Sequence, residues 1–215
     1  MTEPKLSEPV LPGEGGSDYE RYLRTDALLA LQKTADEWVH RDELLFQTVH
    51  QSSELWLKLA VTEVAEAARL IDEDTLGGAI RLMRRGVDCL KIVTGALDML
   101  EHLSPWEYQE VRKVLGHGSG FDSPGFRGVQ KVSPVLGAAF HAARERDGLT
   151  LPEVYTLARE RAGLTLAEVY TLARDHEDLY QLAELLIEWD ERVVVWRARH
   201  FVRSSPSRAN RRLFR

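Results

Sequence analysis

The strongest constraint on the fold is an apolar stripe near the C-terminus that ends on a histidine. Its steps alternate between four and three residues, which keeps every member on one face of a helix. An imidazole on a buried face must satisfy its nitrogens, either by hydrogen bonds or by binding a metal. The final histidine is therefore either a hydrogen-bonded core residue or a metal ligand. The stripe consists of Leu182, Leu186, Trp189, Val193, Trp196 and His200.

A second histidine, His50, lies within another segment of helical spacing, residues 42–59. Phe46 lies one helical turn before it, Glu54 one turn after it and Leu57 two turns after it. These neighbours describe an apolar pocket wall with one polar group, which suits a base or hydrogen-bond donor over a ligand. They suit a core histidine paired with Glu54 equally well.

Cysteine content restricts the kind of metal site that the chain can build. The single cysteine, Cys89, excludes an internal disulfide and a cysteine metal cluster. Any metal would therefore be held by histidine, with carboxylates or inside a cofactor. A bare metal site needs three or four ligands, whereas a porphyrin brings four nitrogens and needs one protein ligand. The two well-placed histidines thus favour haem over a bare metal, if a metal is bound.

Composition also limits the partners and the location. The net charge of −6 gives no reason to expect nucleic acid. No apolar run is long enough to span a membrane, and the first residues do not resemble a signal peptide. A length of 215 residues with 44% hydrophobic content suits one domain with a real core, or two small ones at most. We expect a reduced, cytoplasmic protein without membrane contact.

The pattern along the chain predicts an all-α fold, a helical bundle, and no convincing strand. Helical spacing begins near Tyr19. Further helices are expected over residues 42–71, 76–103 and 177–203, and a short one is opened by Ser104 and Pro105. The apolar side of the 42–71 helix is predicted to comprise Leu45, Val49, Trp56, Leu59 and Val64.

We expect three parts along the chain: a disordered or extended N-terminus (1–17), a helical domain (18–204) and a basic tail (205–215). The tail is either simply solvated, or it screens an anionic cofactor edge or touches a neighbouring subunit. Residues 116–136 contain five glycines and two prolines, which predict an irregular loop. This segment follows no strand and lacks Gly-Lys-Ser, so phosphate binding is disfavoured.

A tandem repeat of period 15 lies within residues 148–175. Each copy begins Thr-x-x-Glu, the pattern of a helix-capping box, as in Thr150 with Glu153 and Thr165 with Glu168. Each copy is therefore expected to start a short helix. Two copies are too few for a solenoid, and a local duplication that lengthened a surface excursion explains them without any chemistry.

Tyr108 and Arg112 are four residues apart on one face of the short predicted helix. Arginine can hold a carboxylate through two parallel hydrogen bonds, and a phenol can add a third. As a clamp, the pair predicts a small acidic or zwitterionic ligand. The alternative is a surface arginine stacked on tyrosine.

Three long segments and one short one resemble the tryptophan 2,3-dioxygenase family. The first, residues 42–59 (DELLFQTVHQSSELWLKL), is similar to the signature helix of that family. The others fall in the same order as in the family. They are residues 19–23 (YERYL), 103–121 (LSPWEYQEVRKVLGHGSGF) and 179–200 (LYQLAELLIEWDERVVVWRARH).

The resemblance implies an all-α, haem b-containing homo-oligomer, a tetramer or dimer, that inserts O2 across the indole C2–C3 bond of L-tryptophan to give N-formylkynurenine. His200 would be the axial iron ligand, with Trp196 beside the haem, and His50 would be the distal catalytic histidine. The residues implied in substrate binding are Phe46 on the indole ring, Arg112 and Tyr108 on the carboxylate, Leu115, Ser119 and Gly120 along the pocket, and Tyr19, Tyr22 and Leu23 from a neighbouring subunit. Ser119 and Gly120 would also line the haem.

The resemblance has two departures. Where the family pattern continues past the axial histidine into a lid, Gly-Thr-Gly-Gly-Ser-Ser-Gly, this chain has a Ser-, Pro- and Arg-containing tail. The family's Phe-Gln-Ser-x-Gln-Tyr-Arg is Phe-Asp-Ser-Pro-Gly-Phe-Arg at residues 121–127. A member without the lid is expected to be less selective for its substrate and to be open to a different oxygen chemistry. The alternatives are a haem-dependent monooxygenase of an indole or phenol amino acid in specialised metabolism, or a non-catalytic haem-binding helical module.

Overall fold

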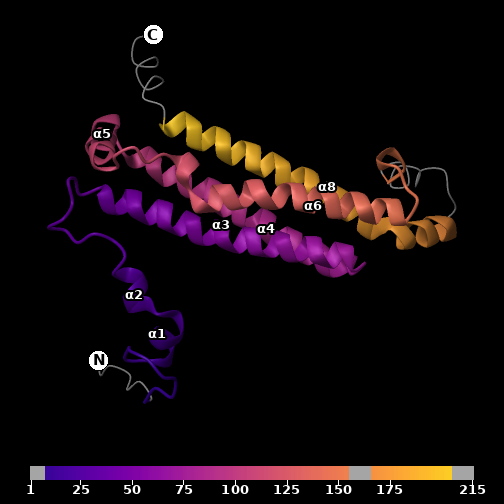
Figure 1. Ribbon diagram of the computed structural model, residues 1–215, viewed down its shortest axis with the longest axis horizontal. Coiled ribbons are helices and arrows are strands. Elements are labelled where there is room, and N and C mark those ends of the chain that lie inside the picture. The colour runs from indigo at the N-terminus through magenta and orange to yellow at the C-terminus, as the bar shows by residue number, and fades with distance from the viewer. Residues whose placement is uncertain (1–7, 155–165, 205–215) are drawn as a thin grey trace, which may run out of the picture.

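The computed structural model describes residues 8–154 and 166–204, and four long helices dominate it (Figure 1). The described residues contain no β-strand, so the predicted all-α fold is confirmed. None of the helices in this part of the chain is long and apolar enough to cross a membrane. The four helices are α3 (Glu43–Asp72), α4 (Leu76–Ala96), α6 (Pro124–Arg146) and α8 (Leu166–Ser204).

The four long helices share one apolar core, which brings distant segments of the chain together. Helices α3 and α6 run in one direction, and α4 and α8 run in the other (Figure 1). At the centre Trp189 of α8 is 1% exposed, and its indole N–H donates to Ser133 Oγ of α6 at 2.9 Å. Each helix supplies fully buried side chains, including Leu57, Val64, Met83, Leu90, Leu136 and Leu182.

Glycines allow α3 to approach its two neighbours closely. A Cβ atom added at Gly125 of α6 would lie 2.6 Å from Leu57 Cβ, and one added at Gly86 of α4 would lie 2.9 Å from Val64 Cγ2. Both distances are shorter than real Cβ contacts. A side chain at either position would force the facing side chains or the helices themselves to shift.

The predicted irregular loop over residues 116–136 is correct up to residue 123 and wrong beyond it, because α6 begins at Pro124 and continues through Pro134. Gly125 and Gly128 lie inside this helix, where they face Leu57 and Val61 of α3. They provide space for helix packing rather than backbone freedom for a loop. Helix α6 is started by the Ser123 side chain, which accepts from the Phe126 N–H, with proline in the first turn.

The other predicted helices differ from the structure mainly at their ends. Helix α4 ends at Ala96 and continues as a 3₁₀ helix, η1 (Leu97–His102). Helix α8 begins at Leu166, so the second repeat copy forms the start of the last long helix and not a separate one. In the first copy, Thr150 and Glu153 do form the predicted cap. Thr165, the predicted cap of the second copy, and the basic tail 205–215 lie outside the described residues.

Short helices cover the end of the bundle where α3 begins and α8 ends. Helix α5 (Pro105–Val114) starts with the predicted cap, in which Ser104 and Glu107 bond each other's backbone N–H. The 3₁₀ helix η2 (Gly120–Asp122) follows it. Two more helices, α1 (Asp18–Leu23) and α2 (Thr25–Leu29), extend away from the bundle (Figure 1).

One part of the predicted core is wrong. Trp56 and Leu59 of α3 are 38% and 39% exposed, whereas Val49 and Val64 are buried as expected. The prediction assigned the large apolar residues of α3 to the core, but alanines complete the face of α3 that packs against the other helices. These small residues, Ala60, Ala67 and Ala68, are buried where α3 contacts its neighbours.

Candidate functional site

Two imidazoles from opposite ends of the sequence face each other at the covered end of the bundle. His50 comes from the second turn of α3, and His200 comes from the last turns of α8. Their ring centroids are 6.3 Å apart and their planes meet at 79°. Both rings are partly buried. The bundle therefore brings together the two histidines that the sequence singles out.

The surroundings of His50 fix its tautomer. Its Nδ1 lies 2.7 Å from the Phe46 carbonyl oxygen, and its ring centroid lies 4.0 Å from that of Phe46. Burial lowers the pKa of His50, while the bond to the Phe46 carbonyl and the charge of Glu54 act in the opposite direction. The neutral ring therefore carries its proton on Nδ1 and leaves Nε2 as an acceptor.

His200 lies against the backbone of Gly120. A Cβ atom added at Gly120 would lie 1.9 Å from His200 Cε1 and 2.7 Å from each ring nitrogen. Burial, and secondarily the charge of His50, lowers the pKa of His200. Among the described residues neither of its ring nitrogens has a hydrogen-bond partner. One turn earlier Trp196 is 5% exposed and stacks edge-on against Phe126 at 5.7 Å.

The chemistry of these two rings suits a haem iron. An axial ligand must be a neutral imidazole with a nitrogen that no protein group occupies, and His200 meets both conditions. The facing His50 also has a free Nε2. Among the described residues, the group of three side chains close enough to hold a bare metal is His40, Asp42 and Glu107, and neither His50 nor His200 belongs to it.

A hollow of about 290 Å³ lies beside His50, between α3 and α5. Phe46, His50 and Leu115, all predicted site residues, line it together with Val111 and Val114. This wall is apolar apart from the imidazole, as expected for a pocket that receives an aromatic ring. The other lining residues, Lys33, Glu43, Gln47 and Gln51, form a polar wall.

The sequence reasoning missed this polar wall. Glu43, Gln47 and Gln51 are spaced four residues apart on α3 and bind the segment 31–39. Lys33 Nζ contacts Glu43 Oε1 at 2.5 Å, and the Lys33 N–H donates to Gln47 Oε1 at 3.1 Å. Burial acts to raise the pKa of Glu43, but bonds from Lys33 and from the Val39 N–H outweigh it and lower that pKa. The four-residue polar spacing in the sequence was the available signal.

The two predicted clamp residues lie next to the hollow but do not line it. The Tyr108 ring lies 6.3 Å from that of Phe46. Arg112 Nη1 donates to the Gly116 carbonyl at 2.7 Å, at the end of its own helix. To reach a ligand in the hollow, the guanidinium would have to leave this carbonyl. Of the remaining predicted residues, Ser119 bonds Asp122 through both its N–H and its hydroxyl.

The predicted N-terminal residues lie away from the histidines of their own chain. Tyr19, Tyr22 and Leu23 are 68%, 79% and 47% exposed on α1. Asp18 accepts from the N–H groups of Val10 and Leu11, which folds the preceding segment back onto α1. This arm presents apolar side chains that nothing in the described part of the chain covers.

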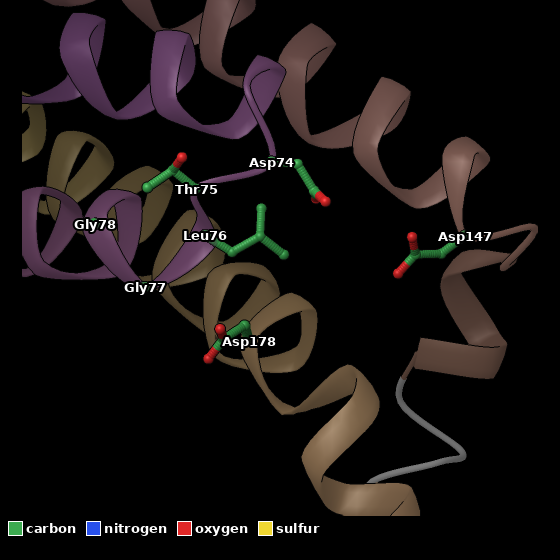
Figure 2. Close-up of a pocket in the computed structure, with 7 residues that line it drawn as sticks. All are labelled: Asp74, Thr75, Leu76, Gly77, Gly78, Asp147 and Asp178. Atoms are coloured by element: carbon green, nitrogen blue, oxygen red, sulfur yellow. The ribbon is translucent and has the colours of Figure 1, made fainter.

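A second hollow, about 460 Å³, lies at the other end of the bundle (Figure 2). Figure 2 shows the carboxylates of Asp74, Asp147 and Asp178 around it, contributed by the α3–α4 turn, the end of α6 and α8. Its other lining residues are Thr75, Leu76, Gly77 and Gly78. It contains none of the predicted site residues.

A family model described as tryptophan 2,3-dioxygenase matches residues 7–142. This stretch includes His50, Tyr108 and Arg112, and His200 lies beyond it. The chain is 32% identical over 217 residues to the tryptophan 2,3-dioxygenase of Caulobacter vibrioides, covering 85% of this chain and 82% of the relative. It is 29% identical over 223 residues to that of Myxococcus xanthus, covering 87% and 77%. It is 40% identical over 129 residues to that of Rhodococcus jostii, covering 60% of this chain and only 45% of the relative.

Proposed function

The chain belongs to the tryptophan 2,3-dioxygenase family, and from this premise we propose that it is a haem-dependent oxygenase that inserts O2 into the indole ring of L-tryptophan or a similar aromatic amino acid. The observation that carries the proposal is the pair of neutral imidazoles from α3 and α8, which face each other beside a hollow with one apolar wall. Dioxygenation, cytoplasmic location and use of haem b are parts of the same proposal.

His200 would hold the haem, with Trp196, Ser119 and Gly120 shaping its surroundings. Haem b supplies the iron at which O2 is activated, which no side chain could provide. Gly120 allows the imidazole to lie flush against the backbone. Because burial keeps His200 neutral, its nitrogen is available to a metal at neutral pH.

The chain's own contribution to the reaction is to bind and orient the substrate. The indole ring would lie against Phe46 and Leu115 in the hollow, and its N–H would donate to His50 Nε2. Arg112 would exchange the Gly116 carbonyl for the substrate carboxylate, with Tyr108 as a second donor. Such positioning removes translational and rotational freedom before the reaction and supplies a large part of an enzyme's rate enhancement.

We further propose that the site is completed in a homo-oligomer, a tetramer or a dimer. The arm with Tyr19, Tyr22 and Leu23 is exposed and directed away from its own bundle (Figure 1). These aromatic and apolar side chains would enter the pocket of a neighbouring copy. The amount of exposed apolar surface on so short an arm favours such burial.

The proposal is tested by supplying the reduced, haem-loaded protein with L-tryptophan and ¹⁸O2 and weighing the product. N-formylkynurenine with two ¹⁸O atoms is the expected result. A product with one ¹⁸O atom would show that the protein is a monooxygenase and not a dioxygenase. Absence of any product, with haem bound, would reduce the protein to a haem-binding helical module.

A further inference from the structure

Glu54 of α3 is bonded to the segment that precedes α6, far away in sequence. Its carboxylate accepts from Ser123 Oγ and, at 2.8 Å, from the Gly125 N–H. Gly125 lies in the first turn of α6, where the N–H groups have no partner within the helix and the helix dipole favours a negative charge. Glu54 therefore fills a place that an anionic side chain occupies best.

The segment that Glu54 holds is a compact turn, residues 119–123. The Ser119 N–H donates to Asp122 Oδ2 at 2.9 Å and its hydroxyl bonds the same oxygen at 3.0 Å, while the Ser123 N–H donates to the Gly120 carbonyl at 3.4 Å. These internal bonds connect both ends of the 119–123 turn to its middle. Its position relative to α3 is set at its end, where Ser123 meets Glu54.

The 119–123 turn carries Gly120, the residue against which the His200 ring lies. Glu54 itself is one helical turn after His50 on α3. A single carboxylate thus connects the helix of one imidazole to the backbone that supports the other. We propose that Glu54 is a positioning residue, whose two bonds to Ser123 and Gly125 hold Gly120 so that the His200 imidazole faces His50.

If Glu54 has this role, replacement by glutamine and replacement by alanine should have different effects. Glutamine can still accept from the Gly125 N–H through its amide oxygen, and its amide nitrogen can donate to Ser123 Oγ. Alanine can form neither bond and leaves the turn unattached to α3. Glu54→Gln should therefore preserve the position of Gly120, and Glu54→Ala should lose it.

Glu63 provides a matched control on the same helix. It is also a partly buried carboxylate of α3, bonded to Arg85 of α4, and it lies nine residues further on, about 14 Å along the helix. Glu63→Gln therefore weakens a connection between two helices without touching the 119–123 turn. A general loosening of the bundle would affect both sites alike.

The test uses the full-length protein, first without haem. In protein labelled at histidine and glycine, the nuclear Overhauser effect between His200 Hε1 and Gly120 Hα reports their contact directly. We expect this signal in the wild type, Glu54→Gln and Glu63→Gln, and its loss in Glu54→Ala. If Glu54→Ala does not fold, Ser123→Ala, which removes the hydroxyl that donates to Glu54, is expected to weaken the same signal.

Haem titration then measures the consequence, which rests on the proposed function. Removing a residue that orients a metal ligand costs roughly 10- to 100-fold in affinity. We expect Glu54→Ala to weaken haem binding by about that factor, and Glu54→Gln and Glu63→Gln to leave the affinity and the Soret band near those of the wild type.

An unchanged signal between Gly120 and His200 in Glu54→Ala would overturn the proposal, as would an equal loss in Glu63→Gln. A wild type that binds no haem would refute the proposed function instead. The nuclear Overhauser comparison would still decide the role of Glu54 in that case.

Discussion

The two ends of the bundle offer hollows of opposite character. At the histidine end, a hollow of about 290 Å³ has an apolar wall and is lined by His50, and burial lowers the pKa values of both His50 and the nearby His200. At the aspartate end, a larger hollow of about 460 Å³ is surrounded by Asp74, Asp147 and Asp178, all exposed. Water solvates exposed carboxylates, whereas partial burial desolvates the two imidazoles and disfavours their charged forms. Desolvation of polar groups, and not the volume of the hollow, distinguishes the candidate site.

The largest expected effect comes from His200→Ala. It removes the proposed iron ligand, so haem affinity should fall by more than the roughly 100-fold that loss of an outer residue can cause. Absorption titration of haem into the purified variant measures the change. An unaltered Soret band and haem affinity would show that His200 is not the iron ligand. The histidine end of the bundle would then have no better claim to a haem site than the aspartate end.

Arg112→Ala tests whether the histidine end also binds a carboxylate. The loss of a charge-assisted, two-bond contact costs about 2 kcal/mol or more, which corresponds to a rise in KM of about 30-fold. Steady-state kinetics with L-tryptophan measures KM and kcat separately. An unchanged KM would mean that Arg112 keeps its bond to the Gly116 carbonyl in the complex and has no part in binding.

Gly120→Ala tests the contact between the 119–123 turn and the His200 ring. The added Cβ would lie 1.9 Å from Cε1, so the ring or the turn must move. Overpacking of this kind costs roughly 1–3 kcal/mol, or about 30-fold in haem affinity at the middle of that range. Gly137→Ala is the matched control, because a Cβ there meets nothing within 4 Å. Equal haem affinities for the two variants would refute the close contact.

The lowered pKa values of His50 and His200 predict how the haem-free protein responds to acid. Below the unfolded-state pKa of about 6.5, the unfolded chain binds more protons than the folded one. The free energy of unfolding should therefore be level above pH 7.5 and decrease as the pH falls through 6.5. Urea unfolding at several pH values measures this slope, which His50→Gln should reduce. A slope that is the same in the variant would show that His50 titrates normally.

The smallest effect is expected at the aspartate end. Asp178→Asn should leave haem affinity and KM unchanged and shift the free energy of unfolding by about 0.5 kcal/mol at most, as is usual for exposed positions. A clear loss of activity in this variant would contradict the assignment of function to the histidine end alone.

Much of the fold followed from local patterns in the sequence. The stripe that ends at His200 predicted the C-terminal helix, and Ser104 before Pro105 predicted the start of α5. Helix α6 could not be found in this way, because Gly125 and Pro134 indicate a loop when they are considered locally. Only the contact of Gly125 with Leu57 shows that glycine is needed there for packing.

The two histidines of the candidate site were predictable from the sequence, whereas its polar wall and its connections were not. Helical spacing identified His50 and His200 as unusual, and the bundle brings them together. The bonds of Glu54 to Ser123 and Gly125 join residues about seventy positions apart, and no local pattern indicates such a partner. The bond of Arg112 to Gly116 was also unexpected, since helical spacing says where a side chain starts and not where its end lies.

The most direct test of the contrast between the two ends is an absorption spectrum of the purified protein with haem, recorded before and after addition of L-tryptophan, in the wild type, His200→Ala and Asp178→Asn. We predict a Soret band that shifts with L-tryptophan in the wild type and in Asp178→Asn, and loss of that band in His200→Ala. A wild type without a Soret band, or a His200→Ala variant with the wild-type spectrum and response, would contradict a haem site at the histidine end.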